Sequence, residues 1–250
     1  MACTSISGGF HLRDNIDAFI HDTLYIDDTG ALRRYFIDFM KPYGFDFLSY
    51  HYIADSFKRV SQDRGFRIAE FPQAWIDHYI ECDYFEIDPT VEETRQRGFP
   101  FRFSDILARD DLTPEQKIFL ADLHEIGFRD GIAIPVFARP GDIAHFILGS
   151  SKEDLEFTPG DLLELQALCQ HMHVRYNEIS KKIVTPKLSP RETQVLELIA
   201  QGKSNAAIGK LLGVSPNTID TLVRRCFEKL GVTTRVEAAL AGVGQGLILP

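Results

Sequence analysis

The chain has 250 residues, of which 44% are hydrophobic and 25% charged, and its formal net charge is −9. No run of about 18 apolar residues occurs, so no membrane-spanning helix is expected. The N-terminus lacks the basic and apolar regions of a signal peptide, and we therefore expect a cytoplasmic protein. The four cysteines are far apart and the eight histidines have no metal-ligand spacing, so we expect reduced thiols, no metal and no other cofactor.

The first 180 residues predict a mixture of helices and strands. Helices are expected over residues 14–25, 30–43, 72–82, 114–126 and 159–182. Residues 45–53, 131–137 and 143–150 are rich in β-branched and aromatic side chains, which is typical of strands. A turn at residues 139–142 makes an antiparallel hairpin of the last two. These elements predict an α+β sandwich, an antiparallel sheet flanked by helices.

One helix-start pattern recurs along the chain. A Ser or Thr followed by Pro, with a polar residue at the third position after the hydroxyl, occurs at Thr113, Thr158, Ser189 and Ser215. The hydroxyl can cap a free backbone N–H, and proline fits the first helical turn. The pattern predicts four helix starts.

Residues 71–89 carry side chains suited to a small molecule. Trp75 and Tyr79 are four residues apart and share one face of a helix, and each combines an apolar ring with one polar group. Asp88 follows an apolar stretch and precedes a proline, which holds its backbone extended. A buried carboxylate needs donors, and a ligand amide N–H is one. The alternative is that Trp75 and Tyr79 are ordinary core and that Asp88 caps a turn.

Charge divides the chain into two parts. From residue 181 onward ten Lys and Arg face five Asp and Glu, a net charge of +5, whereas the first 180 residues carry a net charge of −14. Aromatic side chains are divided the other way, since 27 of the 28 precede residue 181. A basic end is typical of a protein that contacts nucleic acid. We expect domains at residues 1–182 and 189–250, joined by a linker at 183–188.

Three short helices are expected in the second domain, and together they predict an all-α helix-turn-helix. The first covers residues 190–200, the second 204–212, and the third begins at Ser215. Their apolar stripes predict these buried side chains: Val195, Leu196, Ile199, Ile208, Leu211, Leu212, Ile219, Leu222, Val223, Cys226 and Leu230. A tight glycine turn between two helices, the second with a polar outer face, is typical of a helix-turn-helix.

The recognition helix of such a motif, which here is the helix that begins at Ser215, enters the major groove of DNA. Arg224 is suited to guanine and Asp220 to the amino group of cytosine, whereas Lys203, Lys210 and Arg225 are suited to phosphates. The other candidate DNA-binding residues are Asn217, Thr218 and Thr221. The alternative is a solvated helical bundle with a chance pair of arginines.

The segment from Leu188 to the end resembles the LuxR-type helix-turn-helix domain. It keeps the family's Glu192, Leu196, Gly202 and the Lys-Leu-Gly-Val ending at residues 229–232, whereas Leu222 stands where many relatives have a histidine. The resemblance implies a DNA-binding homodimer whose last helix, residues 233–245, is a dimer contact, with RNA polymerase as a partner.

Residues 10–175 resemble the autoinducer-binding domain of acyl-homoserine-lactone receptors. Trp75, Tyr79, Asp88 with its following proline, and Gly131 ahead of a strand carry the resemblance. It implies that Trp75 binds the lactone carbonyl, that Asp88 binds the amide N–H and that Tyr79 packs near the acyl carbonyl. It also implies a cavity lined by Phe47, Phe71, Val91, Phe101, Phe103 and Leu107.

Four positions depart from that family's pattern. Phe103 replaces a second tryptophan over the lactone ring, and Phe71 replaces a tyrosine found in several members. Ile147 replaces a Thr or Ser that donates to the acyl carbonyl, and Ile76 replaces an arginine that helps recognise a 3-oxo group. Each lost donor is worth roughly 0.5–1.5 kcal/mol, so the departures bear on which ligand is bound.

The sequence therefore predicts a ligand-responsive regulator of quorum sensing that binds an N-acyl-homoserine lactone and a palindromic promoter site. The alternative is a LuxR-type solo regulator that senses a different small molecule or acts without one. A phosphorylated receiver domain would need regular βα alternation, which is missing. An enzyme would need a nucleophile, a base and an orienting group at recognisable spacing, and none is found.

Overall fold

The computed structural model describes residues 13–54, 66–138, 142–153, 155–180 and 186–249, and it divides them into two compact units. One unit holds most of the described residues up to Ser180, and the other holds the residues from 186 onward. Half of the expected linker, residues 183–185, lies outside the described residues.

The first unit is built on a five-stranded antiparallel sheet with the order β2-β1-β5-β4-β3. The strands are β1 (Phe47–Ala54), β2 (Phe66–Glu70), β3 (Phe101–Arg102), β4 (Asp130–Phe137) and β5 (Ile143–Ser150). Strands β4 and β5 pair along their whole length, from Asp130 opposite Ser150 to Phe137 opposite Ile143. This confirms the expected hairpin, although residues 139–141 of its turn lie outside the described residues.

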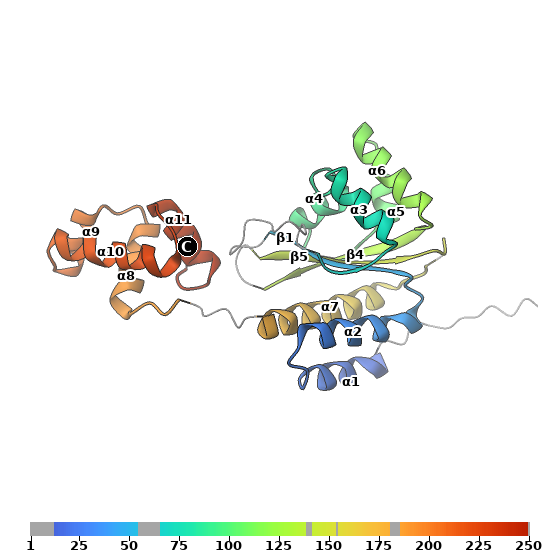
Figure 1. Ribbon diagram of the computed structural model, residues 1–250, viewed down its shortest axis with the longest axis horizontal. Coiled ribbons are helices and arrows are strands. Elements are labelled where there is room, and N and C mark those ends of the chain that lie inside the picture. Colours follow the sequence, from blue (N-terminus) through green and yellow to red (C-terminus); the bar gives the residue numbers. More distant parts are fainter. Residues whose placement is uncertain (1–12, 55–65, 139–141, 154, 181–185, 250) are drawn as a thin grey trace, which may run out of the picture. The chain divides into compact units, whose positions relative to one another are not determined.

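Three helices lie on one side of the sheet: α1 (Arg13–Thr23), α2 (Thr29–Met40) and α7 (Pro159–Ser180) (Figure 1). Helices α2 and α7 pack on the sheet, and α1 packs on these two helices. A short 3-10 helix, η1 (Lys41–Tyr43), follows α2. The core on this face includes Tyr50 of β1 stacked on Phe146 of β5, with ring centroids 4.3 Å apart and planes 4° from parallel.

The other face carries α3 (Gln73–Glu81), η2 (Tyr84–Glu86), α4 (Pro89–Gln96), α5 (Phe103–Leu107) and α6 (Pro114–Glu125) (Figure 1). Because successive side chains of a strand point to opposite faces, β1 sends Tyr50 to the first core and Ile53 to the second. The sheet thus separates two hydrophobic cores, and most of the residues predicted to bind a ligand lie in or beside the second.

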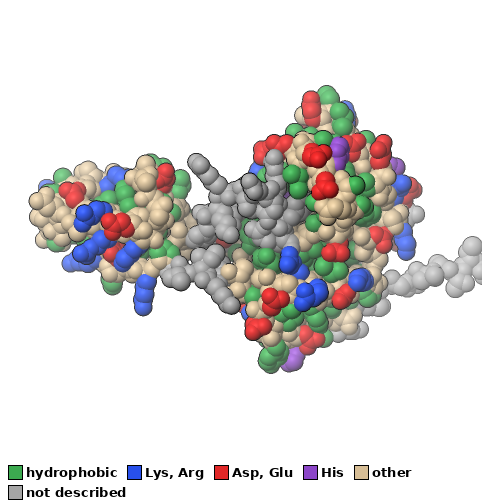
Figure 2. All heavy atoms as spheres, viewed as in Figure 1, with side chains coloured by type: hydrophobic (Ala, Val, Ile, Leu, Met, Phe, Trp, Pro, Cys, Tyr) green, Lys and Arg blue, Asp and Glu red, His purple; other side chains and the backbone are tan. Residues whose placement is uncertain are grey.

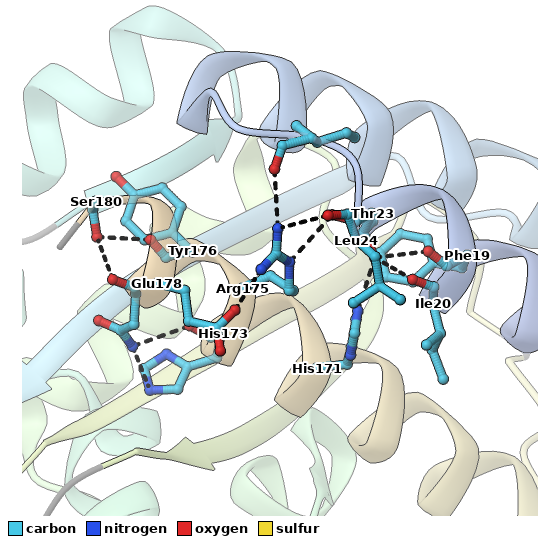
Figure 3. Close-up of polar contacts among 12 residues, drawn as sticks. Phe19, Ile20, Thr23, Leu24, His171, His173, Arg175, Tyr176, Glu178 and Ser180 are labelled. Atoms are coloured by element: carbon cyan, nitrogen blue, oxygen red, sulfur yellow. Dashed lines mark hydrogen bonds and ion pairs between the residues drawn. The ribbon is translucent and has the colours of Figure 1, made fainter. Parts of the chain in front are cut away.

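Helix α7 holds the end of α1 through one arginine (Figure 3). The Arg175 guanidinium donates to the backbone carbonyls of Thr23, Leu24 and Ile26, over distances of 3.0–3.3 Å. Nε2 of His171 lies 2.8 Å from Oγ1 of Thr23. Because the last carbonyls of a helix have no intrahelical partner, these contacts satisfy the C-terminal end of α1 and fix it on α7.

The second unit consists of α8 (Pro190–Ala200), α9 (Asn205–Leu212), α10 (Pro216–Leu230) and α11 (Arg235–Gly244). Most of the side chains expected in its core are buried, but Leu212 and Leu222 are only half-buried and Leu211 is 61% exposed. The expectation for Leu211 was wrong. Helix α9 packs against the core through the face that carries Ile208 and Leu212, four residues apart, and Leu211 lies outside that face.

All four helix starts predicted from the Ser/Thr-Pro pattern are confirmed, since α6, α7, α8 and α10 begin at its prolines. At α8, Oγ of Ser189 accepts from the N–H of Glu192, and the Glu192 carboxylate accepts from the N–H of Ser189 at 2.7 Å. This reciprocal pair satisfies two backbone donors that the helix itself leaves free.

The turn between α9 and α10 packs directly against the backbone of α9. The N–H of Val214 donates to the carbonyl of Gly209 at 3.0 Å. A Cβ atom built on Gly209 would lie 2.8 Å from the carbonyl oxygen of Val214, a distance that requires the backbone to shift. The angle between the two helices therefore depends on glycine at position 209.

We predict that Gly209→Ala destabilises the second unit by about 1–3 kcal/mol, because the added methyl group overpacks the turn. Chemical unfolding of the full chain, followed by circular dichroism, measures the change. Lys210→Ala, on the same helix with an exposed side chain, is the matched control and should leave the midpoint nearly unchanged. Equal midpoints for Gly209→Ala and the wild type would contradict the close packing.

Candidate functional site

A cavity of about 40 Å³ lies within the second core of the first unit, between the sheet and helices α3–α6. Six residues predicted from the sequence line it: Phe71, Trp75, Tyr79, Asp88, Phe103 and Ile147. Eight others line it as well: Ser49, His51, Ala69, Ile76, Thr90, Phe119, Leu123 and Phe128. The wall is apolar except for Asp88 and a small set of neutral polar side chains.

Four predicted residues lie away from this lining. Phe47, Val91 and Phe101 are buried in the same core but do not border the cavity. Leu107, by contrast, is 57% exposed, and its placement in the lining was wrong. Helix α5 is a single short turn whose inward positions are Phe103 and Ile106, three residues apart, so the next residue faces solvent.

The Asp88 carboxylate lines the cavity and also caps helix α4. Its Oδ1 accepts from the N–H of Thr90 at 2.8 Å and from the Thr90 hydroxyl at 2.6 Å, which caps α4. Its Oδ2 accepts from the hydroxyl of Tyr79 at 3.1 Å. Burial raises the pKa of Asp88, while the hydrogen bonds from Thr90 and Tyr79 act in the opposite direction. The two interpretations made from the sequence, ligand contact and cap, are therefore compatible.

Aromatic rings surround Tyr79 and Trp75 on α3. Their ring centroids are 6.2 Å apart, and both rings contact Tyr84 of η2 and Phe119 of α6 at 6.0–6.1 Å. Tilted and edge-on contacts of this kind stabilise aromatic clusters. The packing fixes the orientation of the Tyr79 hydroxyl toward Asp88.

Phe128 contributes to the cavity in a way that the sequence did not reveal. Gly131 of β4 pairs with Gly149 of β5, and the Phe128 ring lies over both glycines: a Cβ atom on either would come within 2.7 Å of it. The ring is also tilted against Phe103, with centroids 4.6 Å apart. Glycine is therefore required at position 131 to leave room for the ring of Phe128, which lines the cavity.

The second unit presents the predicted DNA contacts on its surface. Asn217, Thr218, Asp220, Arg224, Arg225, Lys203 and Lys210 are exposed, and Thr221 is half-buried. Figure 2 shows Lys and Arg side chains gathered on one face of this unit. Arg224 lies 3.8 Å from Glu228, and both side chains are largely exposed, so this pairing is weak in water and leaves the guanidinium available.

Asp220 has a second role that the sequence did not predict. Its carboxylate accepts from the side-chain amide of Asn205, and the Asn205 carbonyl accepts from the Arg235 guanidinium at 2.6 Å. This chain of hydrogen bonds joins the starts of α9 and α11 to the exposed face of α10. Asp220 therefore orients α10 in addition to any contact with a base.

No helix among the described residues has the length and apolar character needed to span a bilayer. No group of three or more His, Cys, Asp and Glu side chains in the described ranges is placed to hold a metal ion.

Comparison with known proteins shows that each of the two units matches a protein family. The family described as autoinducer binding domain matches residues 28–176, and the family described as bacterial regulatory proteins, luxR family, matches residues 186–241. The transcriptional activator protein TraR of Agrobacterium vitis is 25% identical over 211 residues, which cover 82% of this chain and 87% of TraR.

One further relative and one solved structure are similar to this chain. The transcriptional activator protein BjaR1 of Bradyrhizobium diazoefficiens is 26% identical over 180 residues, covering 72% of this chain and 74% of BjaR1. The crystal structure of Escherichia coli SdiA shares the fold, with a TM-score of 0.77 at 18% identity, covering 95% of this chain and 99% of SdiA. The chain therefore belongs to the luxR family of bacterial regulatory proteins, and it is a transcriptional regulator with an autoinducer binding domain, not an enzyme.

Proposed function

We propose that this regulator binds an N-acyl-homoserine lactone in the cavity of its first unit and, as a homodimer, binds a palindromic DNA site through α10. The observation that carries the proposal is the buried Asp88 carboxylate at the cavity wall. A buried carboxylate is costly unless donors surround it, and a cavity for a purely apolar ligand would not need one.

The hydrogen bonds of Asp88 leave room for a ligand donor. A carboxylate has about four acceptor positions, about two on each oxygen. Thr90 donates twice to Oδ1 and Tyr79 donates once to Oδ2, and the N–H of Val91 also acts on the carboxylate. The amide N–H of an acyl-homoserine lactone matches the remaining position on Oδ2. The indole N–H of Trp75, which also lines the cavity, is suited to donate to the lactone carbonyl.

The size of the cavity bears on how a ligand acts. A void of 40 Å³ lowers the stability of the folded domain by about 1 kcal/mol at 24 cal/mol per Å³. The empty cavity therefore destabilises the ligand-free domain only slightly. A lactone ring enters only when aromatic side chains move aside. Stabilisation on binding therefore comes from the contacts of the ligand, and reaches about 2.7 kcal/mol at 100 times the dissociation constant.

We predict that Asp88→Asn weakens lactone binding roughly 10- to 100-fold, because a charged acceptor is replaced by an amide. Thermal unfolding and titration calorimetry of the full-length protein, with unsubstituted lactones of graded acyl length, measure the change. Asparagine can still cap α4, so the melting temperature without ligand should be nearly unchanged.

Glu86→Gln, at an exposed carboxylate on the neighbouring η2, is the matched control and should bind as the wild type does. Unchanged lactone affinity in Asp88→Asn would contradict the amide contact. If no lactone shifts the melting temperature of the folded wild type, the ligand belongs to another class.

A second candidate function is a solo regulator that senses a molecule without a lactone ring. The structure of SdiA in complex with octanoyl-rac-glycerol has a TM-score of 0.77 to this chain at 17% identity. The cavity is bordered by Phe71, Phe103 and Ile147. Each of these side chains replaces a residue with a polar group in the acyl-homoserine-lactone receptors. A monoacylglycerol added to the same titrations separates the two candidates.

For DNA binding, the exposed guanidinium of Arg224 supports a role in base recognition. We predict that Arg224→Ala costs roughly 1–3 kcal/mol on the specific site and relaxes selection at one base. Fluorescence anisotropy against a set of single-base variants of the site measures both effects. Arg225→Ala, assigned to a phosphate, should weaken all sequences alike and lower the salt dependence. Uniform weakening by Arg224→Ala would instead make Arg224 a phosphate contact.

Helix α11 supports the proposal of a homodimer, with RNA polymerase as the expected partner of the DNA-bound form. Val236 is 70% exposed and Leu240 is 69% exposed, and because they are four residues apart they share one face of the helix. Exposed apolar faces of this kind suit a self-complementary interface.

We predict that the double substitution Val236→Glu, Leu240→Glu shifts the full-length protein toward monomer, since charges would be buried across the interface. Sedimentation equilibrium measures the change. Leu211→Glu, at an equally exposed leucine on α9, should leave the dimer intact. Retention of the wild-type mass by the double variant would place the interface elsewhere.

A further inference from the structure

One hydroxyl that borders the cavity has no hydrogen-bond partner among the described residues. Ser49 of β1 is 3% exposed and lines the cavity. No hydrogen bond joins its side chain to another described residue, and its Oγ atom is not among the polar atoms there that are sealed from solvent without a partner. The hydroxyl therefore touches open space, and in a residue this deeply buried that space is the cavity.

The neighbours of Ser49 in the sheet explain why its hydroxyl is unpaired. Successive side chains of β1 point to opposite faces, so Ser49 shares the face of Phe47, which belongs to the second core. On β2 it pairs with Ala69, and β5, on the other side of β1, lines the cavity with Ile147. Both of these side chains are apolar. Because a buried hydroxyl without a partner is costly, a cavity for a purely apolar ligand would be better served by alanine at position 49.

The indole N–H of Trp75 is a second donor in the same state. Trp75 is 6% exposed and lines the cavity, and no acceptor for its N–H is found in the part of the chain that the structure describes. The other hydroxyls of the lining are already engaged, since those of Tyr79 and Thr90 both donate to Asp88. The cavity thus presents one charged acceptor, Asp88, and two unengaged donors, Trp75 and Ser49.

These three groups match the polar groups of an N-acyl-homoserine lactone. The molecule has one amide N–H, which is proposed to bind Asp88, and two carbonyl oxygens, one in the acyl group and one in the ring. Each carbonyl needs a donor in an otherwise apolar space. Trp75 supplies one donor and Ser49 the other. Because the cavity measures only about 40 Å³, groups on its different walls lie within reach of a single small ligand.

We propose that Ser49 is a specificity-determining residue whose hydroxyl donates a hydrogen bond to a carbonyl oxygen of the ligand, the one that Trp75 does not bind. With Trp75 on the lactone carbonyl, that oxygen belongs to the acyl group. The ligand class is then a molecule with an N–H donor and two carbonyl acceptors. A monoacylglycerol, with one carbonyl and no N–H, lacks this set. This inference rests on the proposed function, because it assumes that a lactone occupies the cavity.

The test compares three ligands in calorimetric titrations of the full-length protein. The parent is N-hexanoyl-homoserine lactone. In its thioamide analogue a weakly accepting sulfur replaces the acyl oxygen, and N-(tetrahydrofuran-3-yl)hexanamide lacks the ring carbonyl. We expect Ser49→Ala to weaken binding of the parent about 5- to 20-fold. The wild type should prefer the parent over both analogues, and Ser49→Ala should lose the preference over the thioamide while keeping the preference for the ring carbonyl.

Two further variants and one stability measurement separate a ligand contact from a structural role. Ser49→Thr keeps the hydroxyl and should retain part of the preference over the thioamide. Ser104→Ala, at an exposed serine of α5, is the matched control and should bind as the wild type does. Without ligand, Ser49→Ala should melt at the wild-type temperature or slightly above it, because the hydroxyl that it removes is unpaired.

A clear fall in the ligand-free melting temperature of Ser49→Ala would assign the hydroxyl to the fold and overturn the inference. Equal affinity of the wild type and Ser49→Ala for the parent lactone would also overturn it, and would leave the proposed function standing. Loss of the preference for the ring carbonyl, in place of the acyl carbonyl, would support the Ser49 contact and exchange the roles of the two donors. Absence of binding by every ligand to the folded wild type would reject the proposed function, and this inference with it.

Discussion

The Asp88 carboxylate connects the parts of the chain that form the cavity. Its hydrogen bonds reach the hydroxyl of Tyr79 on α3 and both the backbone and the side chain of Thr90 at the start of α4. Because removing a carboxylate from water is costly, these donors stabilise the folded domain. The same requirement fixes α3 against α4 and aims polar groups at one point of an otherwise apolar space.

A polar network continues from that point across the cavity wall. The Thr90 hydroxyl donates to Asp88 and the Thr90 carbonyl accepts from Thr94, whose hydroxyl contacts the His145–His51 pair. Each member has a defined donor or acceptor role, so the orientation of each side chain depends on the next. The part of the wall beside Asp88 and the part beside His51 are thus joined by hydrogen bonds, in addition to packing.

Much of the fold could be predicted from local chemistry. The Ser/Thr-Pro pattern located four helices, and residues 143–150 were identified with the bounds that β5 has. Helix α4 was not predicted, although Asp88-Pro89 is an equivalent start signal with Asp as the cap, because Asp88 was interpreted as an extended ligand contact or as the cap of a turn and not of a helix. Strands β2 and β3 are five and two residues long, too short for alternation to stand out.

The composition of the cavity was only partly predictable, for a reason that lies in tertiary packing. Trp75, Tyr79 and Asp88 could be selected because their spacing within one segment places them together. His51, Phe128 and Thr90 come from separate elements, and no local pattern indicates that a phenylalanine covers two paired glycines. For Leu107, the exposed side chain follows from where the short helix α5 ends, which the sequence does not reveal.

The dual role of Asp88 sets which positions can vary when the ligand changes. A substitution there that removes the cap alters the start of α4 together with any ligand contact, and the paired Gly131 and Gly149 cannot accept a side chain beneath Phe128. His51 and Ile147 border the same space without capping a helix. Libraries that seek new inducers for this regulator should therefore diversify the sheet-borne side chains and keep the carboxylate and the two glycines constant.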